Sequence, residues 1–133
     1  MAEFRLEGAE GFREKLGLIK RKAPDRIMDK LDDTGKEFVK RARANTPKVS
    51  GNLRKGYMAL PVEKIAGGYQ KGITNKAPHF HLVERGHRKV SRTGQEIGWT
   101  EGKFYLERTV KENEEEIAED LDKWLDELYK ELL

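Results

Sequence analysis

The stretch ANTPKVSGNLR, residues 44–54, is where the chain changes from a helical to a strand-like pattern. Pro47 disfavours helix at the residue before it, so the preceding helix should end here. Gly51 permits backbone angles that other residues resist. Leu53 is placed to anchor the next strand in the core, and Arg54 then falls on the opposite face of that strand. These residues predict a corner that joins a helix to a sheet.

Two helices are predicted before this corner. Residues 9–22 predict a short helix that carries three apolar side chains on one side, Phe12, Leu16 and Ile19. A second helix should start at Pro24 and Asp25, because proline is tolerated in the first turn and an acidic side chain favours the positive end. Its core-facing stripe recurs every three or four residues through about residue 44, at Ile27, Leu31, Thr34, Phe38 and Ala42.

A hairpin is predicted after the corner. Residues 57–65 read as an imperfect strand, and Gly67-Gly68 is a turn signal. A return strand would then place three side chains on one face, those of Tyr69, Lys71 and Ile73.

The next segment is less regular. Residues 77–85 fit either a short helix after Pro78 or a strand. Residues 86–102 are polar and rich in Gly, Ser, Thr and basic residues, so they predict a long flexible loop. A loop of this length inside a compact domain is usually functional or disordered.

The clearest element is a long helix over residues 103–133. Its apolar residues keep a spacing of three, four or seven, at Leu106, Val110, Ile117, Leu121, Trp124, Leu125, Leu128 and Leu132. The stripe is broken over one turn, where its positions are occupied by the polar residues Asn113 and Glu114. Most other positions are charged, and such a helix can pack on its own sheet or extend to a partner.

Length and composition fit a single domain over residues 1–133. Charged residues make up 38% of the chain, against about 25% in an average protein. The chain has no cysteine, which excludes disulfides, thiolate metal sites and a cysteine nucleophile and suits a cytosolic protein. No apolar run reaches the ~18 residues of a membrane span, so we expect no membrane partner.

The net charge of +3 hides an asymmetry along the chain. Residues 1–60 carry a net +6, residues 61–105 a net +4 and residues 106–133 a net −7. One interpretation is a solvated acidic helix that balances the rest of the chain. The other is complementarity between subunits, or a basic surface that faces nucleic acid. The acidic segment argues against a dedicated DNA-binding domain.

Signals for catalysis or metal binding are sparse. His79, His81 and His87 could ligate a transition metal, but Glu84 is the only nearby carboxylate, so we expect no metal. Glu84 with one of these histidines could form an acid–base pair. No nucleophile motif or phosphate-binding loop accompanies it, so we expect neither an enzyme nor a cofactor.

Two basic clusters, Lys20-Arg21-Lys22 and Lys40-Arg41-Arg43, leave an alternative function open. They would contact phosphates without reading sequence. They could equally be solvated helix faces, and few aromatic residues lie among them to stack on bases. The alternative is therefore a small basic non-specific nucleic-acid-binding protein.

Three short motifs carry a family resemblance. They are the turn P-x-x-S-G-x-L-R at residues 47–54, the segment HLVERGH at residues 81–87, and GKFYL at residues 102–106, which opens the last helix. Their order and spacing, over about residues 10–130, resemble the neck or tail-completion proteins of tailed bacteriophages and prophages. These are the small proteins that join tail to head.

The resemblance implies an α+β fold, in which a small, mainly antiparallel sheet packs against the long helix of the N-terminal half and the long C-terminal helix. It also implies a structural virion protein at the head–tail junction, made in the bacterial host cytoplasm. Copies would form a homo-oligomeric, six-fold ring around the DNA channel and would contact neighbouring head-connector and tail proteins. DNA would pass through the lumen without sequence reading, and no catalysis or cofactor is implied.

We expect polar residues at turns in or beside these motifs to mediate assembly, together with the loop over residues 89–100, which can become ordered on docking. These residues are Arg54, Glu84, His87, Arg88, Lys89 and Arg92. Charge reversal at Glu84 or Arg88 should leave folding intact and block tail joining. Leu53, Phe104 and Leu106 are assigned to the core instead.

Overall fold

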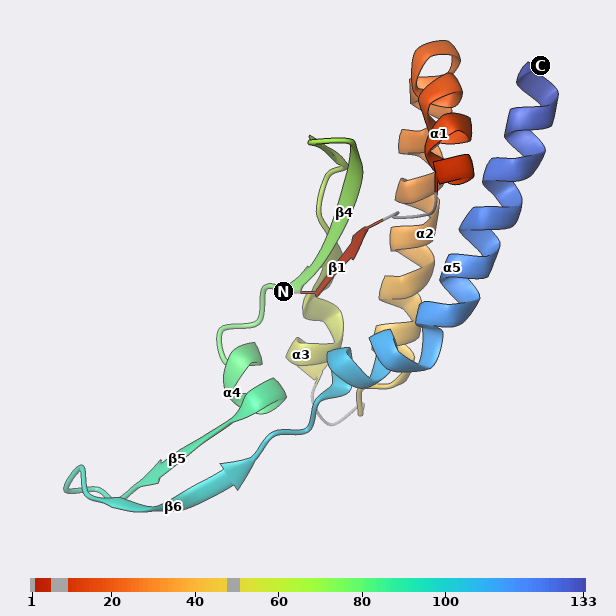
Figure 1. Ribbon diagram of the computed structural model, residues 1–133. Helices are drawn as coiled ribbons and strands as arrows, with labels where there is room; N and C mark the ends of the chain where they lie inside the picture. Colours follow the sequence, from red (N-terminus) through yellow and green to blue (C-terminus); the bar gives the residue numbers. More distant parts are fainter. Residues whose placement is uncertain (1, 6–9, 48–50) are drawn as a thin grey trace.

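The computed structural model describes residues 2–5, 10–47 and 51–133, with side chains described for residues 14–47 and 52–133. Its elements in chain order are β1 (Ala2–Arg5), α1 (Glu10–Lys22), α2 (Pro24–Ala44), α3 (Gly51–Gly56), β2 (Tyr57–Ala59), β3 (Glu63–Ile65), β4 (Gly68–Asn75), α4 (Phe80–Arg85), β5 (Gly86–Val90), β6 (Glu96–Glu101) and α5 (Tyr105–Leu132). Figure 1 shows α1, α2 and α5 side by side, a small sheet next to α2, and a hairpin that projects from this body. Helices and antiparallel strands together confirm the predicted α+β class.

The main sheet is built around β4. β1 pairs with one edge of β4, while β2 and β3 pair with successive parts of the other edge, all in antiparallel register. The predicted β3–β4 hairpin is confirmed, with its turn at Ala66 and Gly67. The single strand predicted over residues 57–65 is wrong, because Pro61 cannot donate a hydrogen bond to the ladder and separates two short strands.

One face of β4 packs on α2. The prediction that Tyr69, Lys71 and Ile73 share one face of this strand is confirmed, since all three are buried. Lys71 is the unusual member, and its Nζ lies 2.6 Å from Asp32 Oδ1 on α2. A Cβ at Gly35 would lie 2.8 Å from Lys71 Cε. The missing side chain at Gly35 therefore makes room for the lysine stem between helix and sheet.

Two apolar clusters hold the body together, and burial of each large side chain contributes about 1.5–3 kcal/mol. The cluster where α1, α2 and α5 meet comprises Leu16, Ile19, Ile27, Leu31, Tyr69, Leu121, Leu125 and Leu128. The cluster where α2, the sheet and the start of α5 meet comprises Phe38, Val39, Ala42, Tyr57, Ile73 and Leu106. The apolar stripes predicted for the two long helices thus face the core.

The predicted break in the stripe of α5 is filled by a polar contact with α2. Asn113 is buried, and its Oδ1 accepts a hydrogen bond from Arg41 Nη1 at 2.6 Å. Its Nδ2 donates to Thr109 O at 2.7 Å. Arg41 Nη2 also lies 2.9 Å from Glu116 Oε1. A buried amide costs little once it is hydrogen-bonded, so the break is a specific α2–α5 contact.

The structure corrects the prediction around the corner. The last residues of the corner belong to the short helix α3, and Leu53 is buried from this helix and not from a strand. Asn75 Nδ2 donates to Leu53 O at 2.7 Å, which ties the helix to β4 and favours it over an extended chain. Of the two alternatives for residues 77–85, the structure has the helix, α4.

Two further predictions near the last helix are wrong. The loop expected over residues 86–102 is an antiparallel hairpin, because the segment pairs with itself across its own turn. Phe104 is 40% exposed and not in the core, since the chain bends there with φ 51° before α5 begins. Within the described residues, no helix is apolar over a length that would cross a bilayer.

Candidate assembly surface

The candidate surface is the projecting hairpin, which we call the arm and define as residues 86–101. β5 and β6 pair from Gly86↔Glu101 to Val90↔Glu96 and form a sheet separate from the main one. The arm extends away from the body, and its tip lies at the end of the molecule opposite the C-terminus (Figure 1). A two-stranded hairpin alone is marginal in water, so contact with a partner would stabilise the arm.

The tip of the arm is a hydrogen-bonded turn. Ser91 N donates to Gln95 O at 2.8 Å, and Gly94 N donates to Ser91 O at 3.0 Å. Gln95 N also donates to Ser91 Oγ at 3.2 Å, and the Ser91 and Thr93 hydroxyls lie 2.9 Å apart. Hydroxyl groups that bond nearby backbone favour turns. The turn therefore helps to fix the register of the two strands.

The two ends of the arm meet at residues 83–86 and 101–104, which we call the foot of the arm. Glu84 holds the foot to the start of α5. Its side chain is buried, and its two carboxylate oxygens accept hydrogen bonds from Leu106 N at 3.0 Å and Glu107 N at 2.9 Å. The first N–H groups of a helix have no partner inside it, and the positive end of the helix favours a carboxylate. Phe104 at the N-cap supplies no side-chain hydrogen bond, so Glu84 caps α5 from α4.

Backbone hydrogen bonds between the segments before and after the arm also hold the foot together. Lys103 N donates to Val83 O at 2.8 Å, and Phe104 N donates to Glu84 O at 3.1 Å. Gly86 has φ +92°, and a Cβ there would lie 2.5 Å from Thr100 O. Glycine is therefore required where β5 leaves α4, and the arm is fixed to the body at a tight junction.

The arm combines exposed apolar side chains with exposed cations. Val90, Ile97 and Trp99 are 61%, 64% and 53% exposed. The exposed cations are Arg88, Lys89 and Arg92. The arm, residues 86–101, holds three Lys/Arg and two Asp/Glu, a net +1. Apolar side chains that gather on an exposed surface are typical of docking sites.

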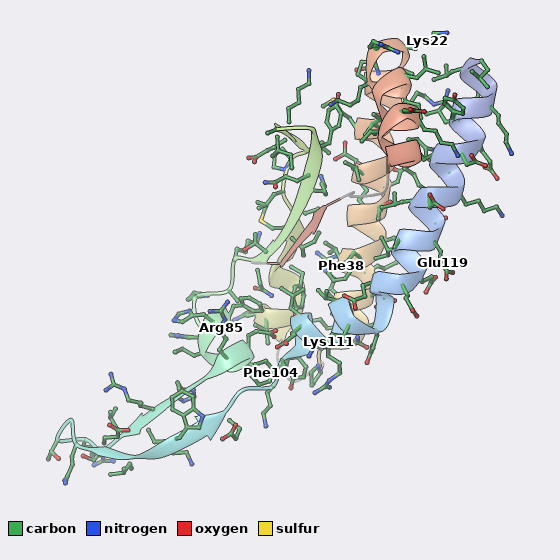
Figure 2. The ribbon with its side chains drawn as sticks, in the orientation of Figure 1. Lys22, Phe38, Arg85, Phe104, Lys111 and Glu119 are labelled. Carbon is green, nitrogen blue, oxygen red and sulfur yellow. The ribbon has the colours of Figure 1, made fainter. Side chains whose placement is uncertain are left out.

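A shallow hollow of about 640 Å³ lies beside the foot of the arm, on the first turns of α5. We call it the hollow, and it is lined by Phe104, Glu107, Arg108, Lys111 and Glu112. Figure 2 shows Phe104 and Lys111 there, with Arg85 on the neighbouring helix α4. The aliphatic stems of arginine and lysine add apolar surface while their charged ends stay in water. The hollow is thus an apolar surface with a charged rim.

The rest of α5 is held to the basic helices by ion pairs. The pairs that join α5 to α1 or α2 are Lys15–Asp126, Arg26–Glu131, Lys30–Asp120 and Arg41–Glu116. The hydrogen bond from Lys15 lowers the pKa of Asp126, Lys130 lowers it further, and the same bond to Asp126 raises the pKa of Lys15. Glu116 likewise raises the pKa of Arg41. Part of the charge asymmetry is therefore matched within one chain.

The basic clusters are divided between internal partners and solvent. Arg41 faces α5, and Arg43 Nη2 donates to Tyr57 O at 3.1 Å. Lys22 Nζ donates to Leu132 O at 3.1 Å. Fewer cations are therefore free to contact phosphates than the sequence alone indicates, which weakens support for the nucleic-acid-binding alternative.

The structure brings four of the predicted interface residues together on the arm, and these are His87, Arg88, Lys89 and Arg92. Arg54 lies apart from them, and its Nε donates to Arg43 O at 3.0 Å, near the end of α2. Glu84 is the buried cap. The sequence predicted that charge reversal at Glu84 leaves folding intact. A cation at position 84 would meet the positive end of α5 in a buried site, so we expect charge reversal there to destabilise the fold.

The three histidines do not form a metal cluster. His79 and His81 are exposed at the start of α4, whereas His87 lies in β5. In the part of the chain that the structure describes, no group of three or more His, Asp or Glu side chains could hold a metal ion. The spacing of these histidines therefore gives no support to a metal-dependent reaction.

Sequence reasoning missed the apolar side of the arm. Ile97 and Trp99 alternate with smaller or polar residues, which is a strand signal. Thr93-Gly94 just before them is typical of a turn. Together these signals would have predicted a hairpin and its exposed aromatic residue.

Comparison with known proteins places the chain in a family. The family model described as "Bacteriophage HK97-gp10, putative tail-component" matches residues 10–86, more than half of the 133 residues. The match runs from the first residue of α1 to the first residue of β5, so it ends where the arm begins. No curated protein and no solved structure matches the chain. The chain therefore belongs to the HK97-gp10-like family of phage tail components.

Proposed function

We propose that the chain is a neck protein of a tailed phage, which completes the tail and joins it to the head. The description of its family as a tail component supports a structural role in the virion. The observation that carries the proposal is the arm, which projects from the body with Val90, Ile97 and Trp99 exposed. Such a surface suits contact between proteins.

The proposed assembly is a six-fold ring around the DNA channel, between the head connector and the tail. Each copy has an arm at one end and a helical body at the other (Figure 1), so it offers two different faces. Contacts between unlike faces generate a ring when the rotation between copies closes. The DNA would pass through the lumen without sequence reading.

A phage with a nonsense codon in the gene for this chain tests the proposal. We expect filled heads and finished tails that remain separate in negative-stain electron micrographs. Purified chain added to the lysate should restore joined, infectious particles. Joined particles at normal levels without the chain would overturn the proposal, and missing or misshapen tails would overturn it in favour of a role in building the tail.

A further inference from the structure

The arm and the hollow are two surfaces on one chain that expose apolar side chains. Ile97 and Trp99 are more than half exposed, and Phe104 in the hollow is 40% exposed. The hollow lies on the first turns of α5, and the arm extends away from the start of α5 (Figure 1). The tip therefore cannot fold back onto its own hollow while β5 and β6 stay paired, so cover for the tip would have to come from another molecule.

We propose that the arm of one copy docks in the hollow of a second copy, with Ile97 and Trp99 as the anchoring side chains. The proposal names the contact by which copies would join, and it rests on the proposed function for its setting in a ring. Large aromatic and apolar anchors in a central pocket dominate the energetics of most protein interfaces.

Charged side chains of the hollow already have partners within the chain, whereas its apolar surface is exposed. Glu107 Oε1 lies 3.2 Å from Lys111 Nζ, and Arg108 Nη2 donates to Lys103 O at 3.1 Å. The charged ends at the rim are therefore already bonded within the chain. What remains is the Phe104 ring and the aliphatic stems, which apolar side chains of a partner would cover.

Charge favours a second copy as the occupant. The arm exposes three cations and carries a net +1, whereas α5 holds four Lys/Arg and eleven Asp/Glu, a net −7. Beyond the hollow, Glu115 and Glu119 are exposed and form no ion pair among the described residues. Figure 2 shows Glu119 on the side of α5 away from α2. Cations of an arriving arm would meet these carboxylates, which steers and orients docking.

Duplex DNA is the competing occupant of the arm. Its phosphates would attract Arg88, Lys89 and Arg92, but a phosphate backbone gives no apolar cover for Ile97 and Trp99. A protein surface satisfies both the cations and the apolar side chains. The arm-to-hollow contact joins unlike faces, so each copy can give one arm and receive one.

Two variants separate the donor from the acceptor. The arm variant carries Ile97→Ser and Trp99→Ser. The hollow variant carries Phe104→Asn and Glu115→Lys, and asparagine is chosen because it tolerates the left-handed backbone at this position. Met58→Ser is the matched control, since Met58 is 41% exposed but lies on β2.

Sedimentation velocity from micromolar to millimolar concentration should show oligomers of the wild-type chain and of the Met58→Ser control. The self-association of each test variant alone should be at least about 30-fold weaker than that of the wild type. An equal mixture of the two should form one-to-one dimers and nothing larger, because each pair keeps one working arm and one working hollow. Circular dichroism and thermal unfolding check that the variants fold, and the single changes Trp99→Ser and Phe104→Asn replace any that do not.

Three results would overturn the proposal without touching the proposed function. The first is a wild-type chain that stays monomeric up to millimolar concentration. The second is a mixture that gives no dimer, or variants that associate as the wild type does. The third is an arm variant that keeps its oligomers but loses binding to short duplex DNA, which would assign the arm to nucleic acid. The nonsense-mutant phage tests the function independently of all three.

Discussion

At the scale of single residues, Glu84 has a structural role that its place in the sequence does not indicate. In the sequence it is one acidic residue among many, followed by Arg85 and Gly86. In the structure it caps a helix whose first turn lies 22 residues further along the chain. No local sequence pattern indicates a contact between residues so far apart. The sequence therefore predicted that Glu84 lies at an assembly interface and did not predict the cap.

Replacing Glu84 by glutamine tests the cap. Glu84→Gln removes the charge and one of the two acceptors from the first turn of α5, so the free energy of unfolding should fall by about 1–2 kcal/mol. Equilibrium unfolding in urea measures it. Glu101→Gln is the matched control on the exposed part of β6 and should change stability by less than about 0.5 kcal/mol. Equal losses in the two variants would contradict the cap.

At the scale of elements, the helices could be predicted from the sequence and the arm could not. α1, α2 and α5 carry apolar stripes, and the side chains that they bury follow from spacing alone. The strands are short, and β2 and β3 are defined only by where they pair with β4. The arm buries little of itself, so it has no hydrophobic pattern facing a core.

Two helical glycines give opposite predictions for the same substitution. A Cβ at Gly17 in α1 would meet nothing within 4 Å, so Gly17→Ala should raise the free energy of unfolding by up to about 1 kcal/mol. A Cβ at Gly35 in α2 would press on the stem of Lys71, which is paired with Asp32. Gly35→Ala should therefore destabilise the protein.

Thermal unfolding of the two alanine variants beside the wild type gives the comparison. The midpoint should rise for Gly17→Ala and fall for Gly35→Ala. A rise in both would show that Lys71 moves aside at little cost, and that Gly35 is not needed for the packing of α2 on the sheet.

At the scale of the whole molecule, the acidic helix and the basic helices form one charged interface. The sequence left open whether their charges match within a chain or between chains. The ion pairs show matching within the chain along the inner side of α5, while Glu115 and Glu119 remain on its outer side. Net charge alone could not divide the two sides, because the division depends on which face of α5 packs inward.

The pair Lys15–Asp126 predicts a pH dependence of stability. The pKa of Asp126 is lowered from its ordinary value of 3.8, so its contribution is present above that value and is lost as pH falls through the lower folded value. The pKa of Lys15 is raised above 10.5, so its contribution is present below that value and is lost as pH rises through the folded value. Asp126→Asn should therefore lower the unfolding midpoint near neutrality and have less effect in acid.

Thermal unfolding between about pH 7 and pH 2 measures whether the unfolding midpoints of Asp126→Asn and the wild type approach each other as the pH falls. Glu127→Gln removes the same charge from an exposed position of α5 that forms no ion pair among the described residues. Its difference from the wild type should be small at neutral pH. A difference for Asp126→Asn that persists unchanged into acid would contradict the assignment of the lowered pKa to the folded state.

The exposed arm also bears on how long an unassembled copy survives in the cell. Arg88, Lys89 and Arg92 lie on or beside a projecting turn, and proteases that cut after basic residues favour such tips. A free copy is open to cleavage there, whereas under the proposed contact a copy whose arm is seated in a neighbour would be shielded. Proteolysis would then remove surplus single copies and spare finished assemblies, so the number of intact chains would follow the number of places built for them.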